Sequence, residues 1–171
     1  MKTTLKRTSK SRAKAASTDL KIASILVPVD FSAPSLKALR YGAALAKKYA
    51  ARLTLLYVVE PVALPDFARS FPLVMENDEA LQACKDKLLR IARDKLLNPE
   101  LVEKCLVRPG RAHVEIVAAA RTLKTDLIVI STHGYSGINH ALMGSVAERV
   151  VRHAPCPVLV VREQEREFIQ T

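Results

Sequence analysis

The sequence predicts a doubly wound α/β domain, in which a five-stranded parallel sheet is covered by helices on both faces. Apolar runs of strand length alternate with segments of helical periodicity along the chain. These runs are rich in Val, Leu and Ile, while aromatic residues make up only 5% of the chain and Trp is absent, which is typical of a buried parallel sheet. With 171 residues and 49% hydrophobic content, the chain is large enough for one domain with a substantial core.

The predicted elements follow one another in the order that such a domain requires. Strands are expected at residues 24–30, 52–60, 101–108, 126–131 and 156–163. Helices are expected within residues 31–50, 76–97, 112–124 and 144–153. Ser32 is the predicted N-cap of the first helix, with Pro34 in its first turn. The domain is therefore expected to span residues 21–165, with residues 166–171 as a short C-terminal tail.

The net charge of +10 is concentrated at the N-terminus. Residues 1–18 contain six basic residues and no acidic one, which leaves 21 basic against 17 acidic side chains in the remainder. Such a composition predicts a solvated, disordered tail over residues 1–20. The alternatives are an arm that contacts nucleic acid or an anionic membrane surface, and an organellar transit peptide.

Cysteine content and hydropathy predict a cytoplasmic protein. Three cysteines, an odd number without a Cys-x-x-Cys pair, favour neither a disulfide framework nor a zinc site. No apolar run reaches the roughly 18 residues that a membrane-spanning helix needs. The charged N-terminus is not followed by the apolar region of a secretory signal.

Residues 131–146, STHGYSGINHALMGSV, contain three of the five glycines and join the fourth predicted strand to the last helix. Gly134 permits a tight turn or the close approach of a ligand, and the amides that open the helix at Gly144 and Ser145 suit a phosphate. If the strand order is 3-2-1-4-5, Asp30 ends the first strand across the same crevice, where it could hold ribose hydroxyls or a cation. The alternative is that the glycines only permit turns, which we favour for Gly137.

Here the sequence resembles the universal stress protein family, over residues 22–163. The resemblance is carried by ILVPVDFS, by STHGYSGINHALMGSVAERVVRHAPCPVLVV and by Gly110 before the third helix. It implies the strand order 3-2-1-4-5 and ATP binding through a motif Gly-x2-Gly-x9-Gly-(Ser/Thr). Ser131 stands where the first glycine of that motif is expected, so its side chain either crowds the ribose or bonds to it. The resemblance also implies a homodimer that pairs through its last strand, at Val158, Leu159, Val160 and Val161.

The function implied is that of an ATP-binding regulatory protein of the stress response, not an enzyme. The implied nucleotide-binding residues are Pro28, Val29, Asp30, Val58, Ile130, Ser131, His133, Gly134, Gly144, Ser145 and Val146, with Asp30 a weak candidate for nucleotide-bound Mg²⁺. His133 could polarise a phosphate or be an ordinary loop histidine. No lysine follows Gly144 as in a Walker A loop. The alternatives are a dimeric interaction module without nucleotide, because of Ser131, and a slow ATPase that uses Asp30.

Overall fold

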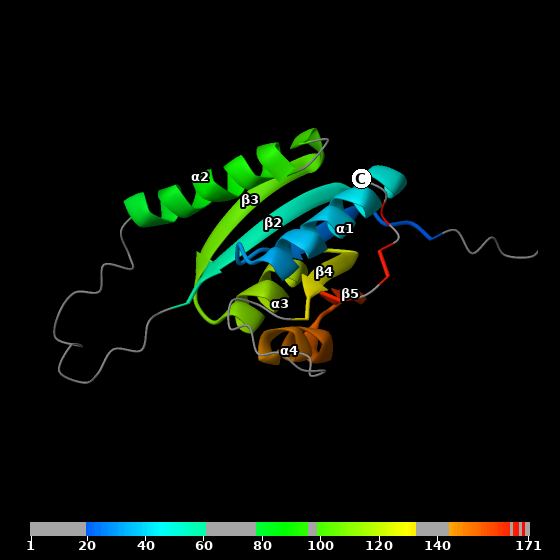
Figure 1. The fold of residues 1–171 in the computed structure, drawn as a ribbon. Helices are drawn as coiled ribbons and strands as arrows, with labels where there is room; N and C mark the ends of the chain where they lie inside the picture. The colour runs from blue at the N-terminus through cyan, green and yellow to red at the C-terminus, as the bar shows by residue number, and fades with distance from the viewer. Residues whose placement is uncertain are drawn as a thin grey trace, which may run out of the picture.

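The computed structural model describes residues 20–60, 78–95, 99–132, 144–164, 166, 167 and 169, and contains the predicted five-stranded sheet (Figure 1). All strand pairs are parallel and the order is β3-β2-β1-β4-β5, as predicted. The strands are β1 (Ser24–Pro28), β2 (Arg52–Val59), β3 (Val102–Pro109), β4 (Leu127–Ser131) and β5 (Val158–Val161). The helices are α1 (Ala33–Tyr49), α2 (Asp78–Lys95), the short 3-10 helix η3 (Pro99–Leu101), α3 (Ala112–Thr122) and α4 (Ser145–His153).

The sheet separates two hydrophobic clusters, one under each pair of helices. Helices α1 and α2 cover one face, where Ile25 and Val27 of β1 are buried, and α3 and α4 cover the other, where Leu26 is buried. In Figure 1, α3 and α4 lie together on the side of the sheet away from α2. Because successive side chains of a strand point to opposite faces, the apolar runs fill both layers, which explains why they read as nearly continuous.

Helix α1 lies unusually close to the sheet at Gly42. A Cβ at this residue would come within 2.5 Å of the Val27 side chain on β1. Glycine therefore lets the helix and strand backbones approach each other in a way that alanine would not. The predicted helix start is also confirmed, since Ser32 is the N-cap and its side chain accepts a hydrogen bond from the Ser35 amide.

Strand β5 is shorter than the predicted run of residues 156–163, and a buried lysine explains where it ends. The Lys37 ammonium of α1 donates to the carbonyls of Arg162 and Glu163, at 3.0 and 2.9 Å, directly after the last strand residue. Lys37 is only 7% exposed and also lies 3.7 Å from the Glu167 carboxylate. The chain after β5 is thus held against α1, where Ile169 also packs on the core.

Among the described residues, no helix combines the length and apolar character required to cross a membrane. The predicted basic N-terminal segment lies outside the described residues, apart from Leu20.

Candidate functional site

The carboxyl ends of the strands form the edge of the sheet at which the predicted site lies. Helices α1, α3 and α4 follow β1, β3 and β4 directly, so all three begin at this edge. A helix begins with amides that have no partner within the helix and with a partial positive charge. What satisfies these amides differs among the three helices.

The start of α1 is closed by its own side chains. The Asp30 carboxylate accepts hydrogen bonds from the Ser32 amide, at 3.0 Å, and from the Ser32 hydroxyl. The Ser32 hydroxyl oxygen also accepts from the Ser35 amide, and the Ser35 hydroxyl donates to the Ser32 carbonyl at 3.0 Å. One oxygen of Asp30, predicted to contact ribose or a cation, is therefore already engaged in the helix cap.

The start of α3 is closed by a carboxylate from another strand. Glu60, immediately after β2, accepts a hydrogen bond of 2.8 Å from the Ala112 amide. The N-cap residue Arg111 provides no side-chain cap of its own. Gly110 makes the turn into this helix with φ 140°, a conformation suited to glycine, and its amide donates to the Val59 carbonyl.

The start of α4 has no side-chain cap among the described residues. Gly144 is the N-cap, so Ser145 is the first helical residue. The Gly144 amide donates to the Thr132 carbonyl at 2.7 Å, which anchors the helix start to the end of β4. The first amide to bond within the helix is that of Glu148, to the Gly144 carbonyl. The three preceding amides, of Ser145, Val146 and Ala147, are those that an anion at a helix start would use.

Four apolar residues of the predicted site lie on one face of the sheet. Val58, Ile130 and Val146 all belong to the hydrophobic cluster beneath α3 and α4. Pro28 is two residues beyond Leu26 on β1, so it projects to this same face, and it pairs with Leu56. These residues therefore lie on the face of the sheet that α3 and α4 cover.

Ser131 and Val29 lie on the opposite face. Ser131 follows Ile130 in β4 and pairs with Val161, which belongs to the cluster beneath α1 and α2, as does Val29. The alternation of a strand therefore directs the Ser131 side chain toward α1, where it is only 8% exposed. His133 and Gly134, also predicted for the site, lie outside the described residues.

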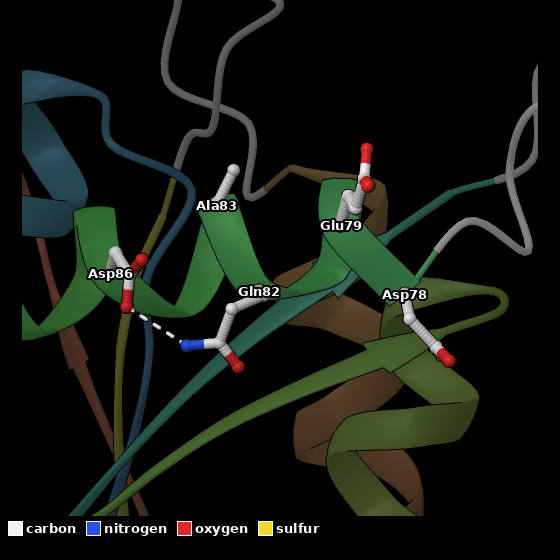
Figure 2. A pocket seen from close by; sticks show the side chains of 5 residues that line it. All are labelled: Asp78, Glu79, Gln82, Ala83 and Asp86. Atoms are coloured by element: carbon white, nitrogen blue, oxygen red, sulfur yellow. Dashed lines mark hydrogen bonds between the residues drawn. The ribbon is translucent and has the colours of Figure 1, made fainter.

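A shallow hollow of the surface lies elsewhere, along one side of α2 (Figure 2). It is lined by Asp78, Glu79, Gln82, Ala83 and Asp86, and a hydrogen bond of 2.9 Å joins Gln82 to Asp86. All five residues come from one helix, and none belongs to the predicted site. We therefore assign the site from the strand ends and not from this hollow.

Sequence reasoning missed a second cluster of side chains beside Asp30, on the face beneath α2. The rings of Phe31 and Tyr57 have centroids 4.6 Å apart, and the Lys87 ammonium lies 4.0 Å from the Phe31 centroid. Burial raises the pKa of the Tyr57 phenol, with smaller contributions from Cys84 and Asp30. The aromatic type of Phe31 and Tyr57 is visible in the sequence, but their contact depends on the pairing of two strands.

Among the described residues, no three His, Cys, Asp or Glu side chains gather closely enough to hold a metal ion.

Solved structures and curated sequences agree on the family. The universal stress protein family matches residues 21–162. A universal stress protein of Methanocaldococcus jannaschii is 37% identical over 150 residues, which cover 84% of each chain. The universal stress protein UspA from Lactobacillus plantarum has a similar structure, with a TM-score of 0.72 at 28% identity over 84% of this chain and all of that one.

Two further structures with this fold contain adenine nucleotides. A universal stress protein in complex with cAMP has a TM-score of 0.57 at 23% identity and covers 84% of this chain and 98% of its own. A universal stress protein from Archaeoglobus fulgidus in complex with dAMP has a TM-score of 0.51 at 22% identity, over 83% of this chain and 99% of its own. By sequence match and by fold, this chain belongs to the universal stress protein family.

Proposed function

We propose that this protein binds an adenine nucleotide, ATP in the first instance, across the carboxyl ends of β1 and β4, and that it acts as a regulatory protein in the stress response. The observation that carries the proposal is the contrast between helix starts at this edge. Oxygen atoms of the protein close the starts of α1 and α3, whereas α4 starts at a glycine without a side-chain cap among the described residues.

The phosphates would lie at the start of α4. The amides of Ser145, Val146 and Ala147 precede the first intrahelical bond, and the helix dipole favours negative charge there. Gly144 has no side chain to compete for these amides, and its backbone is fixed by the bond to Thr132. The Ser145 hydroxyl adds a donor in the first turn. Charge-assisted bonds from such fixed donors are among the stronger ones that proteins make.

The nucleoside would lie on the wall formed by Pro28, Val58 and Ile130. An apolar surface with a few polar groups at its border is the usual composition of a site for a flat base. Asp30 would accept from ribose hydroxyls or reach Mg²⁺ bound to the phosphates. The structures with cAMP and dAMP are of other family members, and they show that this fold accommodates adenine nucleotides.

The test of this function is ATP binding by the full-length chain. Calorimetric titration and thermal melting with ATP and Mg²⁺ should give saturable binding and, at a hundred times Kd, a rise in melting temperature of about 5 °C or more. GTP and inorganic phosphate are the matched ligands for base and phosphate recognition. In Gly144→Val the shift with ATP should disappear while the cooperative unfolding transition remains. A folded wild-type protein that binds no adenine nucleotide at millimolar concentration would contradict the proposal.

Ser131 favours one alternative, a dimeric interaction module that does not bind nucleotide. If the serine excludes the ligand, then Ser131→Gly should create ATP binding that the wild type lacks. The direction of the Ser131 side chain, toward α1 and away from the wall of Val58 and Ile130, favours the nucleotide-binding protein instead. We therefore expect Ser131→Gly to change ATP affinity by less than about threefold, which is under 1 kcal/mol.

We further propose that the protein works as a cytoplasmic homodimer through β5. This strand lies at an edge of the sheet, and Val158, Leu159 and Val160 are only half-buried in the single chain. An apolar edge strand that is left open invites pairing with another strand. Sedimentation of the wild type should give a dimer, and Leu159→Lys should give a folded monomer. A monomeric wild type at high micromolar concentration would contradict this assembly.

A further inference from the structure

The turn that carries Asp30 depends on an unusual backbone conformation at Phe31. Phe31 has φ 67°, in the left-handed region, and lies between Asp30 and Ser32. Bulky residues other than glycine are disfavoured in this region because the Cβ crowds the backbone. The surrounding structure must therefore supply the free energy that keeps Phe31 in this state.

The Phe31 ring is held from two different elements. Tyr57, on β2, lies against it with a centroid distance of 4.6 Å and an interplanar angle of 46°. Lys87, on α2, places its ammonium 4.0 Å from the ring centroid, within the range of a cation–π interaction. These contacts place the ring beneath α2, in the cluster that covers this face of the sheet.

The same turn fixes the Asp30 carboxylate. With Phe31 in the left-handed region, the chain doubles back so that the amide and hydroxyl of Ser32 both donate to the Asp30 side chain. The carboxylate is thereby held in one orientation at the end of β1. A residue that rotates this turn would release both bonds.

We propose that Phe31 is the positioning residue for Asp30, and that Lys87, through the Phe31 ring, couples helix α2 to the nucleotide site. This inference rests on the proposed function in one respect, that Asp30 contacts the nucleotide. It assigns a role to α2, which supplies none of the predicted ligand contacts. Nucleotide bound at Asp30 then stabilises the docking of α2, and loss of that docking weakens nucleotide binding by the same factor, because such coupling is reciprocal.

The sharpest variant is Lys87→Met, which removes the cation and keeps a long apolar side chain on an exposed helix position. ATP affinity should fall by about threefold, the effect expected from one partly exposed cation–π contact. The matched control is Lys85→Met, an exposed lysine on the same helix with the same change in charge, which should leave ATP affinity unchanged. Equal effects of the two variants would show that only net charge matters and would overturn the coupling.

Variants of Phe31 distinguish the effect of its ring on ATP affinity from the effect of its backbone conformation. Phe31→Gly allows the left-handed conformation without strain but removes the ring, so ATP affinity should fall by about tenfold, whereas Phe31→Tyr should bind as the wild type does. If the ring had no role, Phe31→Gly would bind as well as the wild type or better. In the double variant Phe31→Gly with Lys87→Met, the second change should have no further effect, because the ring it acts through is gone.

A measurement on the protein without ligand keeps this inference separate from the proposed function. We expect the Ser32 amide, followed by NMR, to exchange faster with solvent in Phe31→Gly than in the wild type, because its bond to the Asp30 carboxylate depends on this turn. Faster exchange would support the positioning role even if the wild type bound no ATP. A Ser32 exchange rate that is unchanged in Phe31→Gly would overturn it.

Discussion

Helices α1 and α4 both begin at the edge of the sheet where the proposed site lies, but the amides of their first turns are capped differently. Both follow a central strand, and both start at the carboxyl edge of the sheet. The start of α1 is closed by Asp30 and Ser32, whose side chains bond to its first turn. The start of α4 is a glycine, tied to β4 through the backbone bond of Gly144 to Thr132.

This difference indicates that the two helix starts have different roles, one in stability and the other in ligand binding. Side-chain caps stabilise a helix by about 1 kcal/mol, so the α1 end contributes to the stability of the fold. A glycine in the N-cap position costs only a few tenths of a kcal/mol relative to a capping side chain, and it leaves the amides of the first turn to another acceptor. Loss of the Ser32 cap at α1 should therefore lower stability, whereas changes at Gly144 should act mainly on ligand binding.

The largest effect is expected when α4 is given a side-chain cap at its N-terminus, as α1 has. In Gly144→Asp, a carboxylate would cap the amides of Val146 and Ala147, because the backbone of Gly144, with φ −58° and ψ 148°, is one that aspartate adopts readily. The same carboxylate would repel phosphate, and we expect ATP affinity to fall by about 100-fold. Calorimetric titration measures the affinity, and urea unfolding should show stability equal to or slightly above that of the wild type.

The neutral control is Gly144→Asn, which has the same shape and also caps a helix but carries no charge. It should lose less affinity than Gly144→Asp, and the difference should shrink at high salt, since it is electrostatic. Loss of folding in both variants, or full ATP affinity in Gly144→Asp, would contradict the assignment of phosphate to this helix.

The second largest effect should come from Lys37, at the α1 end. Replacing it by methionine leaves the carbonyls of Arg162 and Glu163 without the ammonium that bonds them. Hydrogen bonds to a buried charged group contribute about 2 kcal/mol, which urea unfolding of Lys37→Met should reveal as lost stability. Lys47→Met, at an exposed position in the last turn of the same helix, is the control and should lose only about 0.5 kcal/mol, the value of an exposed charge at a helix end. A loss of similar size in both would argue against the role of the buried ammonium.

Local signals explain how much of this architecture could be predicted from the sequence. The cap at Ser32 was predicted from its position before Pro34 and is confirmed, because a helix cap involves only residues a few positions apart. The strand order 3-2-1-4-5 was implied by the family resemblance and is also confirmed. Four predicted helices are present with ends that differ by a few residues, as fraying ends usually do.

The features that could not be predicted depend on distant parts of the chain. Lys37 stands between two apolar residues of a helix, and its burial follows only from the path of the chain 125 residues later. Glu60 reaches an amide 52 residues away. The left-handed conformation of Phe31 has no sequence signal, because phenylalanine rarely adopts it. At Ser131 the sequence left two alternatives open, and the alternation of β4 now directs the side chain toward α1.

A smaller effect is expected at the N-cap of α1. Ser32→Ala removes the acceptor of the Ser35 amide and one donor to Asp30, so the free energy of unfolding should fall by about 1 kcal/mol. Ser32→Thr keeps a hydroxyl and should restore most of it. Melting of the three proteins without ligand tests the prediction, and no loss in Ser32→Ala would mean that Asp30 alone suffices to cap this helix.

The smallest effect should occur at α3, which lies between the two extremes because its cap comes from another strand. Glu60→Gln keeps an oxygen that can accept from Ala112 but removes the negative charge that the helix start favours. We expect a loss of about 0.5 kcal/mol, the usual value for an exposed charge at a helix end, which salt should diminish. ATP affinity should not change if phosphate binds at α4 alone. A gain in ATP affinity in Glu60→Gln, measured by titration, would mean that the start of α3 also faces the phosphates. In that case only the start of α1 would be capped without contributing to phosphate binding.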